Sequence, residues 1–236
     1  MLRTKCPGEI VFILGGGSTL TAEIAETVRG RPTIALNSTV RLAPWAKVLF
    51  FMDWPWFREH RPLVDYFPGA VLTISRRAAK VLPDKIQLVA PPIVQPKLLS
   101  AGHHAVDVAI AMGARRIVLL GFDCRIVNGR SHCHDDYGHQ KGELYGDVFL
   151  PMWAEYPARA AAAGVEIINA SPGSLIDVFP QISLDLILGV GSRVAANEIG
   201  LPDWRLEGPN FGLENHTAFD EAGTPTPEKG AALLCP

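Results

Sequence analysis

Short apolar runs recur along this 236-residue chain, and they constrain its fold more than any other feature. Each run has the length and the continuous hydrophobicity of a strand that is buried on both faces. Between the runs lie segments in which apolar residues repeat with helical spacing. This alternation predicts βαβ units around a parallel sheet. The runs are 10–14, 33–36, 48–52, 71–74, 86–89, 117–120 and 165–168.

The fold class that follows is α/β: we expect a Rossmann-like three-layer domain with a mostly parallel sheet over residues 1–190. Beyond this part the periodicity fades, and Gly, Pro, Thr and Glu become frequent. We therefore expect 191–236 to be a C-terminal extension that is surface-draped or partly disordered. The segment 148–163 should be helical but broken, because Pro151 and Pro157 each remove a backbone donor. Further helices are expected over 19–28, 56–66 and 102–112.

Composition argues against several classes of protein. Hydrophobic residues make up 48% of the chain, enough for a core, and the formal net charge is −2. Bulk charge therefore gives no support for binding to nucleic acid or to an acidic membrane. The four cysteines form neither a C-x-x-C pair nor a regular framework, which predicts a reduced, cytoplasmic protein. No apolar run approaches the ~20 residues of a membrane helix, so we expect a soluble protein, whose oligomeric state stays open.

Small and hydrogen-bonding residues follow one apolar run after another. The carboxyl ends of parallel strands share one edge of a sheet, and open α/β sheets bind their ligands at this edge. Turn formation explains any single strand end at least as well, but the whole set favours a ligand site. The sequences in question are Gly15-Gly16-Gly17-Ser18, Asn37-Ser38, Asp53-Trp54, Gly121-Phe122-Asp123 and Asn169-Ala170-Ser171.

The glycine-rich turn 15–19 lies between a predicted strand and a predicted helix, where backbone N–H groups can bind a phosphate. It is not a Walker loop, because no Gly-Lys-Ser/Thr follows. It is also a poor dinucleotide fingerprint, since Leu20 replaces the third glycine and Asn37 stands in place of an acid. We therefore expect no nicotinamide cofactor. The alternative is a tight turn with Ser18 or Thr19 as the helix N-cap.

Two further positions are candidates for ligand contact. Ser100 and Gly102 open a predicted helix whose N-terminus would attract an anion. His103 and His104 are adjacent in this helix, so at most one of them should face a ligand. Asp53 lies beside tryptophans and would grip a ribose or a metal while a ring stacks on a base; an N-cap next to core tryptophans explains it equally well.

The polar loop after the run 117–120 carries the chemistry of acid–base catalysis. His132 and His134 are two residues apart, so in an extended chain they share a face. One of them could act as a general base, oriented by Asp123 or Asp135, because an imidazole pKa near 6.5 suits proton transfer. A solvated loop is the next interpretation, and a metal site comes third because zinc sites usually need three or four ligands.

Cys124, next to Asp123, has two interpretations. It could be a nucleophile, but an isolated cysteine at a strand end is more often a small buried filler.

Taken together, these motifs resemble a Rossmann-like superfamily. It contains the archaeal 6-hydroxymethylpterin pyrophosphokinase-like (MptE-like) proteins, the flagellin-modifying motility accessory factors and the bacterial sialyltransferases. The loop 129–135 and the segment Asn169–Pro172 resemble a bacteriophage-borne branch of it, for which the compartment would be the host cytoplasm. The resemblance covers roughly residues 9–180. Its motifs are 15–20, 35–38, 52–54, 101–114 and 117–123.

The resemblance implies a nucleotide donor bound by the turns Gly15–Ser18 and Ser100–Gly102. Asn37 and Asp53 would contact the base, the ribose or a metal, and His132 or His134 would be the general base. The sequence differs from the family's motifs in both turns that are expected to bind the donor: Ser18-Thr19 replaces the family's Pro-Ser, and Ala101-Gly102 replaces its Ser-Gly. Both replacements leave phosphate binding feasible and leave the donor's identity open.

We therefore expect a nucleotide-dependent transferase, and favour a glycosyltransferase with a nucleotide-sugar donor and a hydroxyl-bearing acceptor. The rivals are a Mg-ATP-dependent pyrophosphokinase of the pterin type, with Asp53 and Asp123 as Mg²⁺ ligands, and a non-catalytic nucleotide-binding phage accessory protein. The predicted catalytic residues are His132, His134, Asp123 and Asp135. The predicted donor-binding residues are Gly15, Gly16, Gly17, Ser18, Asn37, Asp53, Ser100, Gly102 and Gly121.

Overall fold

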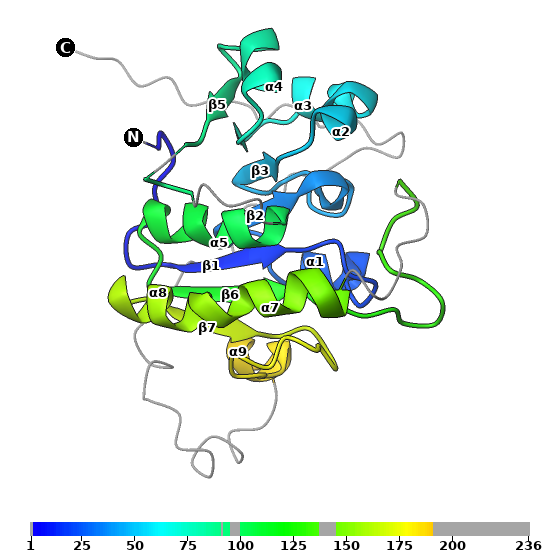
Figure 1. The fold of residues 1–236 in the computed structure, drawn as a ribbon, viewed down its shortest axis with the longest axis vertical. Coiled ribbons are helices and arrows are strands. Elements are labelled where there is room, and N and C mark those ends of the chain that lie inside the picture. Colours follow the sequence, from blue (N-terminus) through cyan, green and yellow to red (C-terminus); the bar gives the residue numbers. More distant parts are fainter. Residues whose placement is uncertain (1, 91, 95–99, 137–144, 191–236) are drawn as a thin grey trace, which may run out of the picture. The chain divides into compact units, whose positions relative to one another are not determined.

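A parallel β-sheet forms the middle layer of the computed structural model (Figure 1). The structure describes residues 2–90, 92–94, 100–136 and 145–190. Within these residues the sheet has seven strands, all parallel, in the order β5-β4-β3-β2-β1-β6-β7. The strands are β1 (Ile10–Leu14), β2 (Thr33–Leu36), β3 (Val48–Phe51), β4 (Ala70–Thr73), β5 (Ile86–Leu88), β6 (Arg116–Leu120) and β7 (Glu166–Asn169).

Helical elements cover both faces of the sheet, so the predicted three-layer α/β architecture is confirmed (Figure 1). Side chains alternate along each strand: Val11 and Ile13 pack with residues of α5 on one face, whereas Phe12 and Leu14 pack with α1 on the other. Burial on both faces is the reason that the strands read as continuous apolar runs. The helical elements outside residues 145–155 are α1 (Ala22–Glu26), η1 (Asn37–Arg41), α2 (Trp54–Glu59), α3 (Arg61–Asp65), α4 (Arg76–Val81), α5 (Ala101–Met112), α8 (Tyr156–Ala162) and α9 (Leu184–Leu188).

The order of the strands reverses between β1 and β6. The chain proceeds outward from β1 to β5 in one direction, and β6 and β7 then lie on the other side of β1. The register pairs Leu14 with Leu120, so the two strands end side by side. Such a reversal is a topological switch point, and open α/β sheets bind their ligands beside it, at the carboxyl ends of the strands.

Two predicted helices differ from those observed, and a third is broken as expected. The helix expected over 19–28 begins only at Ala22, because Thr21 is its N-cap and its hydroxyl accepts from the Ile24 N–H at 3.2 Å. The helix expected over 56–66 is two helices, α2 and α3, that meet at His60. The expected break in 148–163 is present, as a succession of short elements before α8. These elements are η2 (Tyr145–Phe149, a π-helix), α7 (Leu150–Met152) and η3 (Trp153–Glu155).

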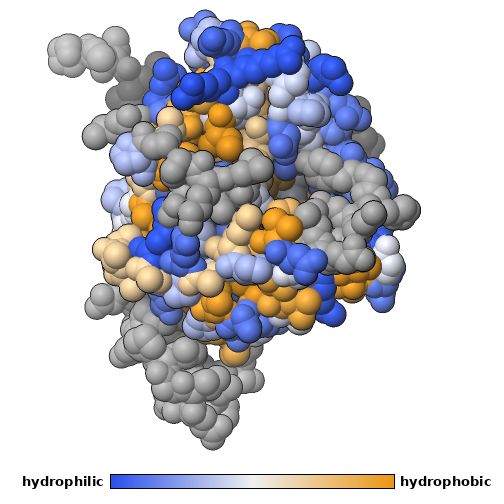
Figure 2. Space-filling model, in the orientation of Figure 1, coloured by the Kyte–Doolittle hydropathy of each residue, from blue (hydrophilic) through white to orange (hydrophobic). Residues whose placement is uncertain are grey.

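Hydrophilic residues cover the face shown in Figure 2 over α4, and apolar residues reach the surface over α7. Within the described ranges, none of the helices has the length and hydrophobicity to cross a bilayer. The expectation for 191–236 falls outside the described residues.

Backbone hydrogen bonds join the loops that follow β1 and β6. The N–H of Gly15 donates to the Leu120 carbonyl and the N–H of Gly17 to the Gly121 carbonyl, both at 2.7 Å. A Cβ on Gly17 would lie 2.5 Å from the Gly121 carbonyl oxygen, and Gly121 itself has a φ of +71°. Glycine is therefore required here by close backbone approach and by a left-handed conformation.

This junction predicts a large cost for Gly121→Ala. The new methyl group would lie 2.7 Å from the Gly15 carbonyl oxygen and 2.9 Å from Cβ of Leu20. We expect the free energy of unfolding to fall by about 2–4 kcal/mol, the sum of a left-handed backbone and an overpacked contact. Gly30→Ala is the control, because Gly30 has a φ of +80° but no neighbour within 4 Å of a Cβ. Urea unfolding with equal losses for both variants would contradict the prediction.

Candidate functional site

A cavity of about 560 Å³ lies at the carboxyl ends of the strands, around the switch point. Part of its lining comes from the residues that follow β1, β2, β3 and β6, and part from the segment 145–153. Its charged lining side chains in the described part of the chain are two carboxylates. The lining residues are Gly15, Gly16, Gly17, Leu36, Asn37, Met52, Asp53, Ser100, Ala101, Gly102, Gly121, Phe122, Asp123, Cys124, His132, His134, Tyr145, Val148, Phe149, Met152 and Trp153.

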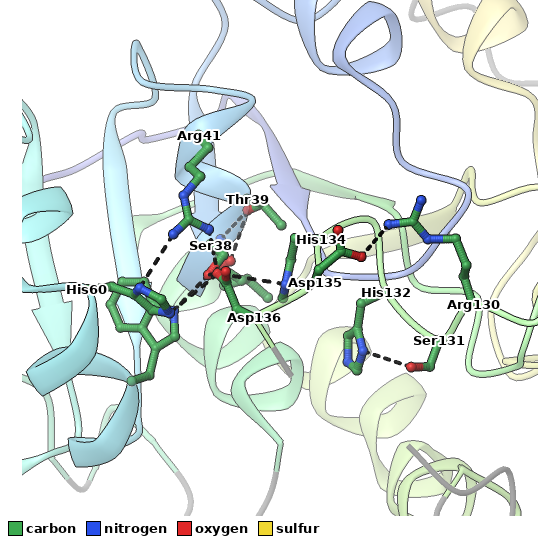
Figure 3. Close-up of polar contacts among 12 residues, drawn as sticks. Ser38, Thr39, Arg41, His60, Arg130, Ser131, His132, His134, Asp135 and Asp136 are labelled. Atoms are coloured by element: carbon green, nitrogen blue, oxygen red, sulfur yellow. Dashed lines mark hydrogen bonds and ion pairs between the residues drawn. The ribbon is translucent and has the colours of Figure 1, made fainter. Parts of the chain in front are cut away.

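All the predicted site residues line this cavity except Ser18 and Asp135. The Asp135 side chain is 94% exposed and forms an ion pair with Arg130 at 2.8 Å, away from His132 (Figure 3). The Ser18 hydroxyl donates to Asp123 at 3.3 Å. The structure therefore brings together residues from five separate stretches of the sequence and leaves these two outside the lining.

Asp123 connects the loop after β6 to the loop after β1. Its side chain is buried, and its carboxylate accepts from the Thr19 N–H at 2.9 Å, from the Thr19 hydroxyl and from the Ser18 hydroxyl. Thr19, the residue expected to open the helix, is therefore bonded to Asp123, and α1 starts only after its N-cap Thr21. The carboxylate is thus bound to the glycine turn and holds it against β6.

The N-terminus of α5 forms another part of the lining. Ser100, Ala101 and Gly102 face the cavity, and the twelve residues of α5 give this end a helix dipole that favours an anion. A Cβ on Gly102 would lie 2.6 Å from Phe122, so packing against this ring requires the glycine. The Ser100 hydroxyl contacts Nδ1 of His103 at 2.7 Å.

His103 and His104 are buried inside the domain, and neither lines the cavity. The ring of His103 stacks on Trp153 with 3.8 Å between centroids. Burial lowers the pKa of His103 to about 3, with a further contribution from His104. Burial also lowers the pKa of His104. Both histidines are therefore neutral core residues near pH 7.

Two lining residues that are not glycine have left-handed backbone conformations. Asn37 has a φ of +50° and Cys124 a φ of +48°. Asparagine tolerates this region better than most residues, whereas for cysteine it is strained. Burial raises the pKa of the Cys124 thiol to about 12. A protonated thiol is a poor nucleophile, which favours the filler interpretation of Cys124.

Asp53 follows β3 and occupies the N-cap position of α2. Its side chain makes no capping hydrogen bond to the helix in the described structure, and it faces the cavity instead. Burial raises the pKa of this carboxyl above its ordinary value. Nowhere in the described ranges do three or more His, Cys, Asp or Glu side chains gather as a metal-binding group. Asp53 can thus contact a ligand, but among the described residues it does not belong to a metal-binding group of this kind.

His132 and His134 lie over the glycine turn, with 5.4 Å between their stacked rings. A Cβ on Gly16 would lie 3.4 Å from Cδ2 of His132 and 3.5 Å from Nε2 of His134. The Cys133 N–H donates to the Gly16 carbonyl at 2.9 Å and holds the loop in place. Burial lowers the pKa of His132. The pKa of His134 is lowered to about 4, mainly by burial and next by the neighbouring His132. Both imidazoles are therefore neutral near pH 7 and able to accept a proton.

An apolar wall that sequence reasoning missed completes the cavity. Its aromatic members belong to the short helical elements before α8, and the Tyr145 hydroxyl donates to the Ser131 carbonyl at 3.0 Å. In the sequence, the segment 145–153 is rich in aromatic residues and follows the polar loop. The same pattern is equally typical of an ordinary amphipathic helix, so it did not indicate a cavity wall. The wall consists of Tyr145, Val148, Phe149, Met152 and Trp153.

One predicted strand end is structural. Asn169, the last residue of β7, and Ser171, in the turn after it, are buried and do not line the cavity. The Ser171 hydroxyl accepts from the Phe122 N–H at 2.7 Å, and Ser174 donates to the Phe122 carbonyl at 2.6 Å. Turn formation and backbone support, rather than ligand contact, explain these polar residues.

The fold and the cavity define a Rossmann-like α/β protein with a candidate ligand site at its switch point. The fold is similar to that of the sialyltransferase CstII from Campylobacter jejuni, which was solved with a substrate analogue, cytidine-5'-monophosphate. The TM-score is 0.53 at 15% identity, over 80% of this chain and 88% of that chain. A thiamin pyrophosphokinase from Geobacillus thermodenitrificans matches with a TM-score of 0.34 at 17% identity, over 67% of this chain and 58% of that one. Neither the protein-family models nor the curated proteins give a match.

The hydrogen bonds of Asp123 predict a structural cost for Asp123→Asn. The amide would present a donor to Thr19 or Ser18, both of which already donate to the carboxylate. We expect the free energy of unfolding to fall by about 1–3 kcal/mol. Asp135→Asn should change it by less than ~0.5 kcal/mol, because that carboxylate is exposed. Similar losses for the two variants in chemical denaturation would refute this account of Asp123.

The buried histidines predict that acid destabilises the protein. The folded pKa values of His103 and His134, about 3 and about 4, lie below the ordinary value of 6.5. Between these values the unfolded chain binds more protons, so stability rises with pH through this window and falls on acidification below pH 6.5. We expect the urea midpoint to fall between pH 7 and pH 5, and to fall less in His103→Gln. An unchanged slope in this variant would contradict the assignment.

Proposed function

We propose that this chain is a nucleotide-dependent transferase, and specifically a glycosyltransferase with a nucleotide-sugar donor and a histidine general base. The observation that carries the proposal is the shared cavity: two neutral imidazoles lie over the glycine turn, and the N-terminus of α5 lines the same space. The likeness to a sialyltransferase fold solved with cytidine-5'-monophosphate supports this class of donor.

The residues divide into a donor side and an acceptor side. We assign the phosphate of the donor to the N-terminus of α5 at Ser100 and Gly102, together with the glycine turn. Asn37 and Asp53, which line the cavity after β2 and β3, would contact the base or the ribose. The apolar wall offers aromatic surface to a sugar or to the acceptor.

The chemical step uses one proton acceptor. His132 or His134 removes the proton of an acceptor hydroxyl while this oxygen attacks the anomeric carbon of the donor sugar. The bond between that carbon and the phosphate oxygen breaks, and the nucleotide leaves with the electron pair. The N–H groups of the α5 N-terminus stabilise the negative charge that develops on the departing phosphate.

The Mg-ATP-dependent pyrophosphokinase is less well supported by the site. It would require Asp53 and Asp123 as metal ligands, since Mg²⁺ binds oxygen. Asp123 instead accepts hydrogen bonds on both carboxylate oxygens, from Ser18 and Thr19. This engagement favours a structural role for Asp123 and a donor that is bound without a carboxylate-held metal.

Nucleotide binding tests the proposal. We expect cytidine monophosphate to raise the melting temperature without Mg²⁺, and a ligand at a hundred times its Kd adds about 2.7 kcal/mol of stability. UDP, GDP and ATP are compared with and without Mg²⁺. Stabilisation that requires both ATP and Mg²⁺ would favour the kinase, and no stabilisation by any nucleotide would overturn both enzymatic proposals. Binding without turnover, across a panel of sugar donors and hydroxyl acceptors, would favour the non-catalytic phage accessory protein.

A further inference from the structure

The loop after β6 that carries His132 and His134 is called the histidine loop here. Asp136 lies where this loop meets two other elements. Its carboxylate accepts from the Ser38 hydroxyl and from the Arg41 guanidinium, both in η1 (Figure 3). Nε2 of His60, at the end of α2, lies 3.4 Å from the same carboxylate oxygen. The Ser38 hydroxyl in turn accepts from the indole N–H of Trp56 at 2.8 Å. One carboxylate therefore connects the loop after β6 to the elements after β2 and β3.

This contact distinguishes the two histidines of the cavity. Nδ1 of His134 faces Asp136 with 3.8 Å between nitrogen and oxygen (Figure 3). Its Nε2 lies on the side of Gly16. Nδ1 of His132 instead contacts the Ser131 hydroxyl at 3.0 Å. A carboxylate behind one ring nitrogen, with the other nitrogen directed to a ligand cavity, is the arrangement that selects a tautomer and stabilises an imidazolium.

The charges around the pair are consistent with this role. Burial alone would raise the pKa of Asp136, but the hydrogen bonds from Ser38 and Arg41 hold it below its ordinary value, so the group is ionised at neutral pH. The titratable and charged groups that face His134 are His132, Asp136, Arg41 and His60. Asp136 is the anion among them, and its charge opposes the effects of the other three on the ring of His134.

We propose that Asp136 is a positioning residue that orients His134, rather than His132, as the proton acceptor of the cavity. The proposal rests on the proposed function for the reaction and deepens it by choosing between the two histidines. With Nδ1–H directed at the carboxylate, the lone pair of Nε2 is left on the cavity side, where an acceptor hydroxyl would lie. The positive charge that the ring gains on taking the proton is then stabilised by Asp136.

The first test needs no turnover. Long-range ¹H–¹⁵N spectra of the wild-type protein at pH 7.5 should show His134 as the Nδ1–H tautomer. In Asp136→Asn the amide can present a donor to Nδ1, so we expect a shift toward the Nε2–H tautomer. Asp135→Asn is the matched control, because its carboxylate is exposed and paired with Arg130, and it should leave the tautomer unchanged. An Nε2–H tautomer in the wild type would overturn the proposal even if no variant folds.

The second test uses turnover with the donor identified by binding. Asp136→Asn should lower kcat at least ~10-fold, with KM for the donor unchanged within about twofold. His134→Ala should lower kcat by about 10²–10⁴-fold, and His132→Ala by much less. Loss of turnover only in His132→Ala would overturn the choice of His134. If the tautomer responds to Asp136→Asn but no donor is turned over, the orientation of His134 stands and the proposed transferase fails.

Discussion

The contact between the loops after β1 and β6 is the interaction on which the rest of the site depends. Two backbone hydrogen bonds, from Gly15 to Leu120 and from Gly17 to Gly121, bring these loops into direct contact at the switch point. Any side chain at Gly17 would collide with the Gly121 carbonyl, so the close approach exists only because both positions are glycine. Asp123 then binds the end of the glycine turn. The cavity takes its shape from this junction, because both of its central loops are held there.

The histidine loop packs on the glycine turn and depends on its position. It is attached to the glycine turn by the hydrogen bond from Cys133 to Gly16 and to η1 by Asp136. These two attachments place neutral imidazoles over the turn Gly15–Gly17, whose residues have no side chains. The arrangement combines a glycine surface that admits a ligand with bases that are directed at it, and burial keeps these bases unprotonated near neutral pH.

Much of the site could be predicted from residue type at strand ends, since parallel strands must deliver their carboxyl ends to one edge. This rule selected Asn37, Asp53 and Gly121, all of which line the cavity. It failed where the same residue types bind the backbone: the Ser171 hydroxyl accepts from the Phe122 N–H, and the Asn169 side chain accepts from the Ser171 N–H. It also gave no means to separate Asp135 from Asp136, because adjacent carboxylates in a loop are distinguished only by what packs against them.

The sequence by itself determined the class of fold and the inventory of chemistry. Continuous apolar runs require strands that are buried on both faces. Glycines between a strand and a helix are recognisable as a turn in which the backbone needs the freedom of glycine. Only the tertiary structure decided the strand order, which sets β6 beside β1 and so brings loops a hundred residues apart together. It also decided that Asp136, and not its neighbour, lies behind His134. Periodicity reports which side of an element is buried, whereas the partner of a polar side chain depends on how distant elements pack.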